Sequence, residues 1–228
     1  DLIEYMAVPS VAGVETAPFG NVGKVVNKGW EFAATYRKTI NDINFNIWGN
    51  LSSVTSEVKD LGDLPFLQHS TTMNSMQPLR SAVGEPWYSY YLIKTDGIFQ
   101  NQSEVDAYKK DGHLIQPEAK PGDFRFKDLD NNGVIDENDR EFIGNPIPDI
   151  TYGLSFDATY KNFDLSILFQ GVVGNEIYNA AKFYYMRFDG KHNVRVEYLD
   201  NYWAGENTSN TQPIPSSDLT RNNNNFRN

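Results

Sequence analysis

Residues 150–169 alternate apolar and polar side chains so regularly that few folds can accommodate them. From 150 to 160 every even position is apolar and every odd position is polar or glycine. This period of two is the geometry of a β-strand, whose successive side chains point to opposite faces. The alternation resumes over 163–169, where Leu168 breaks it. With a turn at Lys161 and Asn162, it predicts a β-hairpin with strands at about 150–160 and 163–171. The expected pairs are Tyr160 with Phe163, Ala158 with Leu165, Phe156 with Ile167 and Leu154 with Phe169.

Residues 26–55 repeat this design and predict a second hairpin. Its strands are expected at about 26–37 and 43–55, joined by a short turn at 38–41. The alternation favours a register with Tyr36 opposite Ile43. The same register places Ala34 opposite Phe45, Phe32 opposite Ile47 and Arg37 opposite Asp42.

The length of these strands suits either a membrane barrel or a soluble sandwich. Strands are usually about five or six residues long, whereas a tilted strand needs roughly 9–11 residues to cross a bilayer. Tyr152, Tyr160 and Phe163 suit the aromatic girdles of a barrel. A half-buried strand pair in a soluble sandwich shows the same alternation, so the pattern alone leaves both folds open.

The connections favour the barrel. About ninety residues separate the two hairpins and about sixty follow the second, whereas connections in compact soluble domains are short. Short turns at one rim and long loops at the other are typical of an outer-membrane barrel, with extracellular loops here at about 56–149 and 172–228. Short helices are expected in these loops at 103–110, 175–187 and 193–203. The polar side chains that would line the lumen are Asn44, Asn46, Asn50, Ser52, Asp157, Thr159, Asp164 and Gln170.

Composition narrows the classes of partner. A net charge of −10 argues against nucleic acid and anionic membrane surfaces as partners. No apolar run approaches a transmembrane helix, and the absence of cysteine rules out disulfides. Four or five strands cannot close a barrel and Asp1 is not a natural start, so we expect an internal fragment of a longer protein, with 1–228 as part of one barrel domain.

Residues 128–139 match a calcium-binding loop. Oxygen donors on alternate residues can wrap a hard cation, and Gly133 permits the sharp turn. Asp139 replaces the usual Glu at position 12, so any calcium affinity is expected to be weak, with Kd roughly 10⁻⁴–10⁻³ M. The alternative is an Asx-rich turn whose carboxylates cap backbone N–H groups. The candidate metal ligands are Asp128, Asp130, Asn132, the Val134 carbonyl, Asp136 and Asp139.

The densest aromatic cluster is at residues 87–91, and its candidate ligand-binding residues are Trp87, Tyr88, Tyr90 and Tyr91. Such rings stack well on sugars or on peptide side chains. The alternative is a strand packed inside the loops. No nucleophile elbow, phosphate-binding loop or dinucleotide fingerprint is present, and the three histidines show no zinc spacing, so we do not expect an enzyme.

Several motifs together resemble the C-terminal part of the SusC/RagA family, the TonB-linked outer-membrane proteins of Bacteroidetes. They cover nearly the whole chain in the order found in the family. The motifs are NVGKVVNKGWEF at 21–32, DGIFQN at 96–101, PGDFRFKDLDNNGVID at 121–136, IGNP at 143–146, FDLS at 163–166, QG at 170–171 and GNEIYN at 174–179.

This resemblance implies a 22-stranded barrel with an N-terminal plug in a Gram-negative outer membrane. It implies energised import of large nutrients, usually glycans or oligosaccharides and sometimes peptides. A SusD-like surface lipoprotein would act as lid and TonB as energy coupler. Substrate contacts vary within the family, so no substrate residue carries over. The alternative function is a secreted, calcium-stabilised β-sandwich that binds carbohydrate through the 87–91 aromatics.

Overall fold

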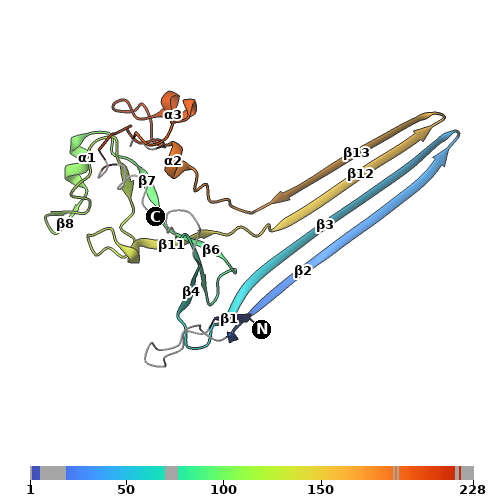
Figure 1. Cartoon of the computed structure of the whole chain (residues 1–228), viewed down its shortest axis with the longest axis horizontal. Helices are drawn as coiled ribbons and strands as arrows, with labels where there is room; N and C mark the ends of the chain where they lie inside the picture. Colours follow the sequence, from blue (N-terminus) through green and yellow to red (C-terminus); the bar gives the residue numbers. More distant parts are fainter. Residues whose placement is uncertain are drawn as a thin grey trace. The chain divides into compact units, whose positions relative to one another are not determined.

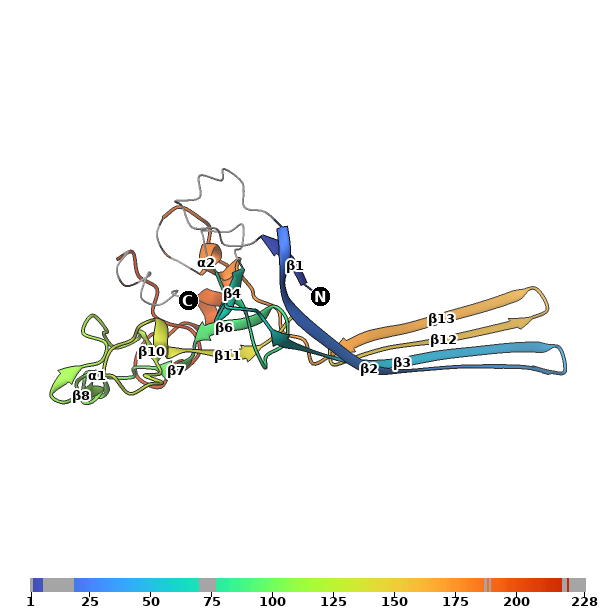
Figure 2. The same ribbon diagram turned by 90° about the horizontal axis from the view of Figure 1, so that it is seen from below.

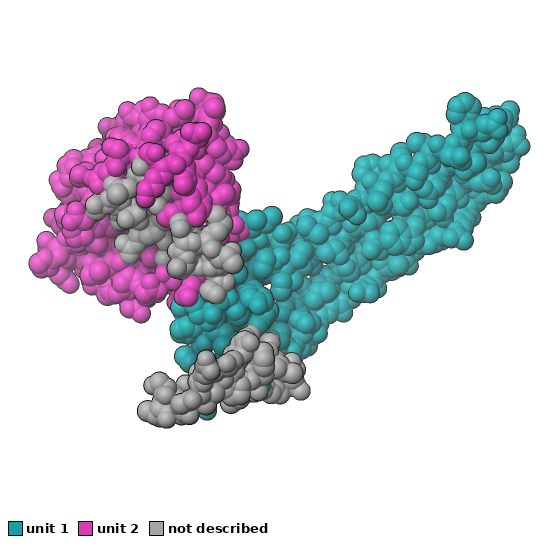
Figure 3. Space-filling model, viewed as in Figure 1, with its two compact units in different colours: residues 1–69, 79–90, 144–177 teal, residues 70–78, 91–143, 178–228 magenta. Residues whose placement is uncertain are grey.

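The computed structural model describes residues 2–5, 19–69, 77–186, 188, 190–218 and 221. The chain divides into two compact units, each drawn in its own colour in Figure 3. Unit 1 holds Asp1–His69, Leu79–Tyr90 and Gly144–Ile177, and unit 2 holds Ser70–Pro78, Tyr91–Ile143 and Tyr178–Asn228. Antiparallel strands make up most of the regular structure, which confirms the all-β class.

Unit 1 is built on one antiparallel sheet with the strand order β1-β2-β3-β12-β13. The strands are β1 (Leu2–Tyr5), β2 (Phe19–Ile40), β3 (Ile43–Asp60), β12 (Ile150–Tyr160) and β13 (Phe163–Val173). Figure 1 shows β2, β3, β12 and β13 side by side along their length, and Figure 2 shows them as a single thin layer. All four predicted strands are therefore present, and β2 and β3 extend beyond their predicted ends.

The β12–β13 hairpin has the predicted register. Tyr160 pairs with Phe163, and the pairing continues without a shift to Ile150 opposite Val173. Lys161 opens the two-residue turn at φ +51°, in the left-handed region. A turn of this hand matches the right-handed twist of the two strands, which keeps them paired over eleven residues each.

The predicted register of the β2–β3 hairpin is wrong by four residues. Tyr36 pairs with Ile47 instead of Ile43, because the strand continues to Ile40 and only Asn41–Asp42 remain as the turn. Asparagine tolerates the left-handed φ of +52° found at the first turn position, so the tighter turn pairs more backbone. The predicted partners of Ala34, Phe32 and Arg37 shift likewise, to Gly49, Leu51 and Asn46. Since four is even, every side chain keeps its predicted face.

Strands β3 and β12 join the two hairpins into one surface. They pair along the whole of β12, from Ile150 opposite Ser53 to Tyr160 opposite Ile43. The residues between them in sequence therefore leave the sheet and return to it at neighbouring strands. The consequence is that β2, β3, β12 and β13 share one apolar face and one polar face.

The apolar face of this sheet is solvent-exposed in unit 1. Within the part of the chain that the structure describes, no second sheet packs on it, as a two-layer sandwich would require. Soluble monomers rarely expose so large a contiguous apolar surface. The exposed side chains are Trp30, Phe32, Tyr36, Ile40, Leu51, Tyr152, Leu154, Tyr160, Phe163, Leu165, Ile167 and Phe169.

A smaller group of strands completes unit 1. They are β4 (Phe66–His69), β5 (Leu79–Ala82) and the first residues of β6 (Ser89–Ile93), with β5 paired to both neighbours. The N–H of Val58 donates to the Glu85 carbonyl, and the Val58 carbonyl accepts from Gly84 N–H. Val58 and Leu61 are fully buried at this end of β3.

Unit 2 consists of residues from the predicted loops. Its strands are β7 (Thr95–Ile98), β8 (Lys109–Lys110), β9 (His113–Leu114), β10 (Phe124–Phe126) and β11 (Arg140–Gly144). β10 pairs with β7, β8 with β9, and β11 is hydrogen-bonded to β6. Two small cores hold them, one around Phe99 and Val105 and the other around Ile115 and Phe126. Local packing of this kind gives an ordered body without long strands.

Residues 198–218 and Arg221 pack onto residues 97–123 within unit 2. The Arg221 guanidinium donates from Nε to the Asp123 carboxylate at 2.6 Å, and Asp123 is fully buried. Tyr198, also buried, donates its hydroxyl to the Pro213 carbonyl, and burial raises the pKa of Tyr198 above its ordinary value. The Asn210 side chain accepts the N–H of Ile98. Segments about a hundred residues apart in sequence therefore fold together.

The loop helices are shorter than predicted. Helix α1 covers Gln102–Ala107, and its N-cap is Asn101, whose side chain accepts the N–H of Glu104, instead of Ser103. Helices α2 (Lys182–Tyr185) and α3 (Val196–Asn201) occupy only parts of the predicted ranges 175–187 and 193–203. No helix among the described residues is both long and apolar enough to span a membrane.

The corrected register makes a testable prediction. Paired Cα atoms lie about 4.5–5.5 Å apart, within disulfide reach, whereas four residues along a strand add about 13 Å. Oxidation should therefore cross-link the double variant Tyr36→Cys/Ile47→Cys and leave Tyr36→Cys/Ile43→Cys reduced. Cross-linking of the second pair in place of the first, measured by mobility on non-reducing gels, would contradict the register.

Candidate functional site

The polar face of the four-strand sheet is the candidate functional surface of unit 1. The register aligns Arg37 of β2, Asn46 of β3, Asp157 of β12 and Ser166 of β13 in one row across the strands. Arg37 Nε donates to Asn46 Oδ1 at 3.1 Å, and Asn46 Nδ2 donates to Asp157 Oδ2 at 3.0 Å. Ser166 Oγ donates to Asp157 Oδ1 at 2.6 Å. Hydrogen-bonded side chains therefore cross all four strands.

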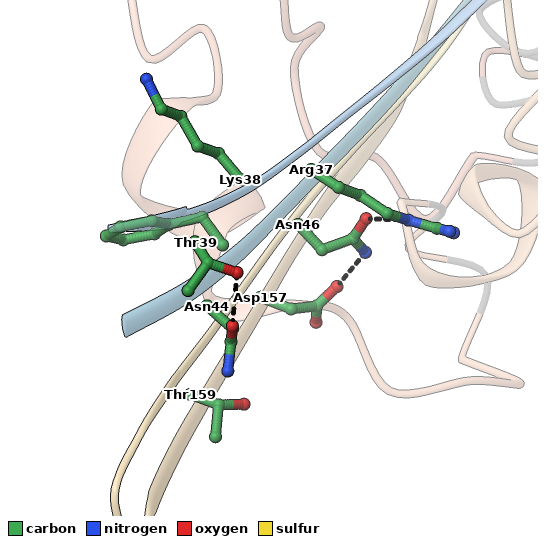
Figure 4. Close-up of a pocket in the computed structure, with 8 residues that line it drawn as sticks. Arg37, Lys38, Thr39, Asn44, Asn46, Asp157 and Thr159 are labelled. Atoms are coloured by element: carbon green, nitrogen blue, oxygen red, sulfur yellow. Dashed lines mark hydrogen bonds between the residues drawn. The ribbon is translucent and has the colours of Figure 1, made fainter. Parts of the chain in front are cut away.

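Asn46 links opposite charges in this row. Figure 4 shows its amide between Arg37 and Asp157, with the oxygen toward the cation and the nitrogen toward the anion. Hydrogen bonds with one ionised partner are shorter and stronger than neutral ones. Ser155 adds a longer contact of 3.4 Å to the same Asp157 carboxylate. The row therefore holds both signs of charge on the sheet without direct contact between them.

Shorter pairs extend the polar face in both directions. Thr39 Oγ1 donates to Asn44 Oδ1 at 2.7 Å near the turns, and Ser52 and Thr151 share a 2.6 Å bond toward the other end. A concavity of about 410 Å³ lies over the turn-proximal part. The polar residues that line it are Arg37, Lys38, Thr39, Asn44, Asn46, Asp157 and Thr159. This part of the face therefore carries two cations, Arg37 and Lys38, and one anion, Asp157, beside neutral polar groups.

The sequence identified the polar face but not this row. Asn46 and Asp157 were predicted lumenal residues. Arg37 was expected opposite Asp42, and neither Ser155 nor Ser166 was among the predicted lumenal residues. Their contacts depend on the pairing of β3 with β12, which are about ninety residues apart, and on the corrected β2–β3 register. The one signal in the sequence was the regular recurrence of polar residues at odd positions in β12 and even positions in β3.

The acidic loop in unit 2 brings together three of its predicted metal ligands. One carboxylate oxygen each from Asp128, Asp130 and Asp139 lies within 4.8 Å of the other two. Gly133 has φ +89°, as the sharp turn requires. The side chain of Asn132 lies 3.5 Å from that of Asp136, and Val134 donates its N–H to Asn132 Oδ1. All six predicted ligands therefore belong to one compact turn.

The same carboxylates also cap backbone groups. Asp128 accepts the N–H groups of Asn132 and Gly133, and the buried Asp139 accepts those of Leu129 and Asp136 at 2.7 Å each. A carboxylate has about four acceptor positions, so these bonds leave room for a cation. The donor set consists of hard oxygens and fits calcium chemistry. This geometry is compatible with both the metal loop and the Asx-rich turn.

The predicted aromatic cluster divides into separate environments. Trp87 and Tyr88 pack edge to face with centroids 5.2 Å apart, and His69 lies 5.1 and 4.2 Å from them. Tyr88 is exposed and has φ +63°, a strained conformation for a bulky residue. Tyr90 is buried and donates to the Glu176 carbonyl, and Tyr91 packs on Phe142 in unit 2. The sequence missed His69, which reaches the cluster only through the β4–β5 pairing.

The row makes a prediction about coupling. The single variants Asn46→Ala and Asp157→Ala each remove one end of the same hydrogen bond, so their losses of unfolding free energy should not add. Denaturation of the double variant should show a smaller loss than the sum of the single losses. Thr55→Ala, nine positions from Asn46 along β3, is the control and should add to Asp157→Ala. If the losses of the Asn46 and Asp157 variants add as fully as those of the Thr55 and Asp157 variants, the hydrogen-bonded row is contradicted.

Comparison with known proteins shows which proteins the chain is similar to. No protein-family model matches the chain. TonB-dependent receptor P26 of Formosa agariphila is 31% identical over 225 residues, which are 97% of this chain and 21% of that receptor. TonB-dependent receptor SusC of Bacteroides thetaiotaomicron is 24% identical over 224 residues, 92% of this chain and 19% of SusC.

Solved structures show the same fold. A structure of the RagAB peptide transporter superposes with a TM-score of 0.68 over 96% of this chain and 23% of that chain, at 19% identity. A second structure, of the RagAB peptide importer in an open-open state, gives a TM-score of 0.65 at 21% identity. The resemblance in the sequence motifs is therefore confirmed: the chain is similar in sequence and fold to the SusC/RagA family of TonB-dependent receptors, and it spans about a fifth of their length.

Proposed function

We propose that this chain is part of a β-barrel that imports large nutrients across the outer membrane of a Gram-negative bacterium. One observation carries the proposal, which is that a single four-strand layer has a continuous apolar face on one side and a hydrogen-bonded polar face on the other. A barrel wall between lipid and a hydrated lumen needs both faces. The relatives named as TonB-dependent receptors support the same function.

The strand lengths agree with this assignment. β12 and β13 have eleven residues each, which is the upper end of the roughly 9–11 that a tilted strand needs to cross the hydrocarbon core. The two-residue turns at Asn41–Asp42 and Lys161–Asn162 correspond to the short periplasmic turns of such a barrel. Unit 2, built from the predicted loops, then belongs to the extracellular side.

Import of this kind needs partners and no covalent chemistry. We infer that a TonB-type protein supplies the energy, in keeping with the name of the TonB-dependent receptors. We also infer that a SusD-like surface lipoprotein contacts the extracellular loops. The proposed cargo is a glycan or oligosaccharide, with a peptide as the alternative. Trp87 and Tyr88, together with His69, are proposed cargo contacts in the loops because Tyr88 presents an exposed ring.

We further propose that the acidic loop binds calcium and stiffens the extracellular part of the chain. Three carboxylates in one turn repel one another unless a cation or N–H groups neutralise them, and here both can act together. The 3₁₀ turn Glu137–Asp139 closes the loop and leads directly into β11. Binding would therefore order the connection back to the sheet.

Calcium titration tests the loop directly. The protein should bind Ca²⁺ with Kd of about 10⁻⁴–10⁻³ M. Asp130→Ala should abolish this binding because it removes one of the calcium ligands. Asp130 is exposed, so its substitution leaves no cavity in a core. Glu137→Ala, which removes an exposed acid of the same loop that is not a predicted ligand, is the matched control and should retain it. Calorimetry that finds no calcium binding to the unsubstituted protein would leave the Asx-rich turn as the correct description.

Arginine scanning tests the import barrel. Ala34 and Thr35 are adjacent, small and exposed, and the register places Ala34 in the apolar row with Leu154 and Thr35 on the polar face. Arginine facing lipid near the midplane costs about 2–4 kcal/mol, whereas arginine in the lumen is tolerated. Ala34→Arg should therefore reduce the folded receptor in outer-membrane fractions, and Thr35→Arg should not. Equal yields of both variants would contradict the proposed orientation.

A further inference from the structure

Trp48, Leu168 and Val172 are apolar residues on the polar face of the sheet, and they lie near one another. Trp48 of β3 is in the same cross-strand row as Leu168 of β13, and Val172 lies four residues farther along β13. All three are exposed, at 37%, 62% and 53%. Random breaks in the alternation would not be expected to gather at one place. This grouping points to a surface that binds something other than water.

A glycine forms the floor of this surface. Gly153 of β12 lies between Asn50 of β3 and Gln170 of β13 in the register. A Cβ at this position would come 2.5 Å from Asn50 Oδ1 and 3.6 Å from Cζ3 of the Trp48 ring. The absence of that atom leaves room for the Asn50 amide and the edge of the Trp48 ring. The concavity that these residues line measures about 440 Å³, within the range of about 300–1,000 Å³ typical of small-molecule sites.

The chemistry of the lining selects a neutral ligand. None of the nine residues that line the concavity carries a charge, in contrast to the Arg37–Asp157 region of the same face. Asn50 Oδ1 is shielded from solvent and has no hydrogen-bond partner. A buried acceptor without a hydrogen bond destabilises the folded protein by about 1–3 kcal/mol. Rotation of the Asn50 side chain so that its oxygen accepts from a bound hydroxyl group is therefore favourable. Amides donate and accept, as hydroxyl groups do.

We propose that Trp48, Asn50, Gly153 and Gln170 form a sugar-binding subsite on the lumenal face. One neutral pyranose ring lies with its C–H face on the indole, above the space left by Gly153, and its hydroxyl groups bond to the two amides. This subsite deepens the proposed import function and rests on it. It lies apart from the Trp87–Tyr88 cluster in sequence and in chemistry, since its polar groups are amides on rigid strands.

Fluorine NMR of the full-length receptor in detergent tests the subsite. The 5-fluorotryptophan signal of Trp48 is assigned by its loss in Trp48→Phe. Glucose, galactose, mannose, xylose and N-acetylglucosamine are then titrated at millimolar concentrations, with blocked trialanine as the peptide probe. At least one sugar should shift the signal saturably. No shift with any sugar, or a shift with trialanine alone, overturns the proposal.

Variants separate a binding site from a passive surface. Gly153→Ala should weaken the sugar response about tenfold or more, equivalent to about 1.4 kcal/mol, because the added Cβ fills the floor. Gln170→Ala adds no atoms, so it should weaken the response even if Gly153→Ala fails to fold. Thr55→Ala, on β3 but outside the concavity, should bind normally. Unchanged binding in both subsite variants overturns the proposal.

The experiments distinguish failure of the sugar-binding subsite from failure of the proposed import function. A receptor that inserts with the predicted arginine pattern at Ala34 and Thr35 but shows no sugar response loses only the subsite. A receptor that fails the arginine test loses the lumenal assignment, whatever its response to sugars.

Discussion

The structure depends on one register held across four neighbouring strands. Side chains alternate between faces with a period of two, so a slip of one residue would send every apolar side chain of that strand to the polar face. β12 pairs with both neighbours without a shift, and the β2–β3 pairing shifts only at Lys24–Val25, beyond the two-faced region. One tight turn fixes the register of each hairpin, and the β3–β12 pairing fixes the hairpins to each other.

The two faces solve different energetic problems. Apolar side chains gain by leaving water, and no described element covers them on this sheet. In the proposed barrel, contact with lipid supplies that gain. On the other face, Asn46 and Ser166 supply donors to Asp157, so the charge remains hydrogen-bonded. The backbone adds a third demand: among the described residues β13 is an edge strand, and an unpaired edge in hydrocarbon costs several kcal/mol per group. Further strands of a closed barrel would satisfy it.

The strands could be predicted from the sequence because they depend on local periodicity. Contacts between segments far apart in the chain could not. The β12–β13 register followed from a two-residue turn at Lys161, whereas the β2–β3 register was wrong because a shift of four leaves the alternation unchanged. The row through Arg37 and Ser166 was out of reach, since it needs a pairing across ninety residues. In the loops, an apolar stripe over 175–187 predicted a helix longer than the four residues found, because contacts with the rest of unit 2 set the structure there.

The central claim is that one face of this sheet contacts acyl chains. Since these 228 residues contain no cysteine, single cysteines introduced from 150 to 160 can each carry a spin label in the membrane-embedded receptor. Accessibility to oxygen, which concentrates in lipid, and to a water-soluble nickel chelate should alternate with a period of two. Oxygen should dominate at positions 152, 154, 156 and 158, and nickel at 153, 155 and 157. Equal nickel accessibility on both faces would contradict the account.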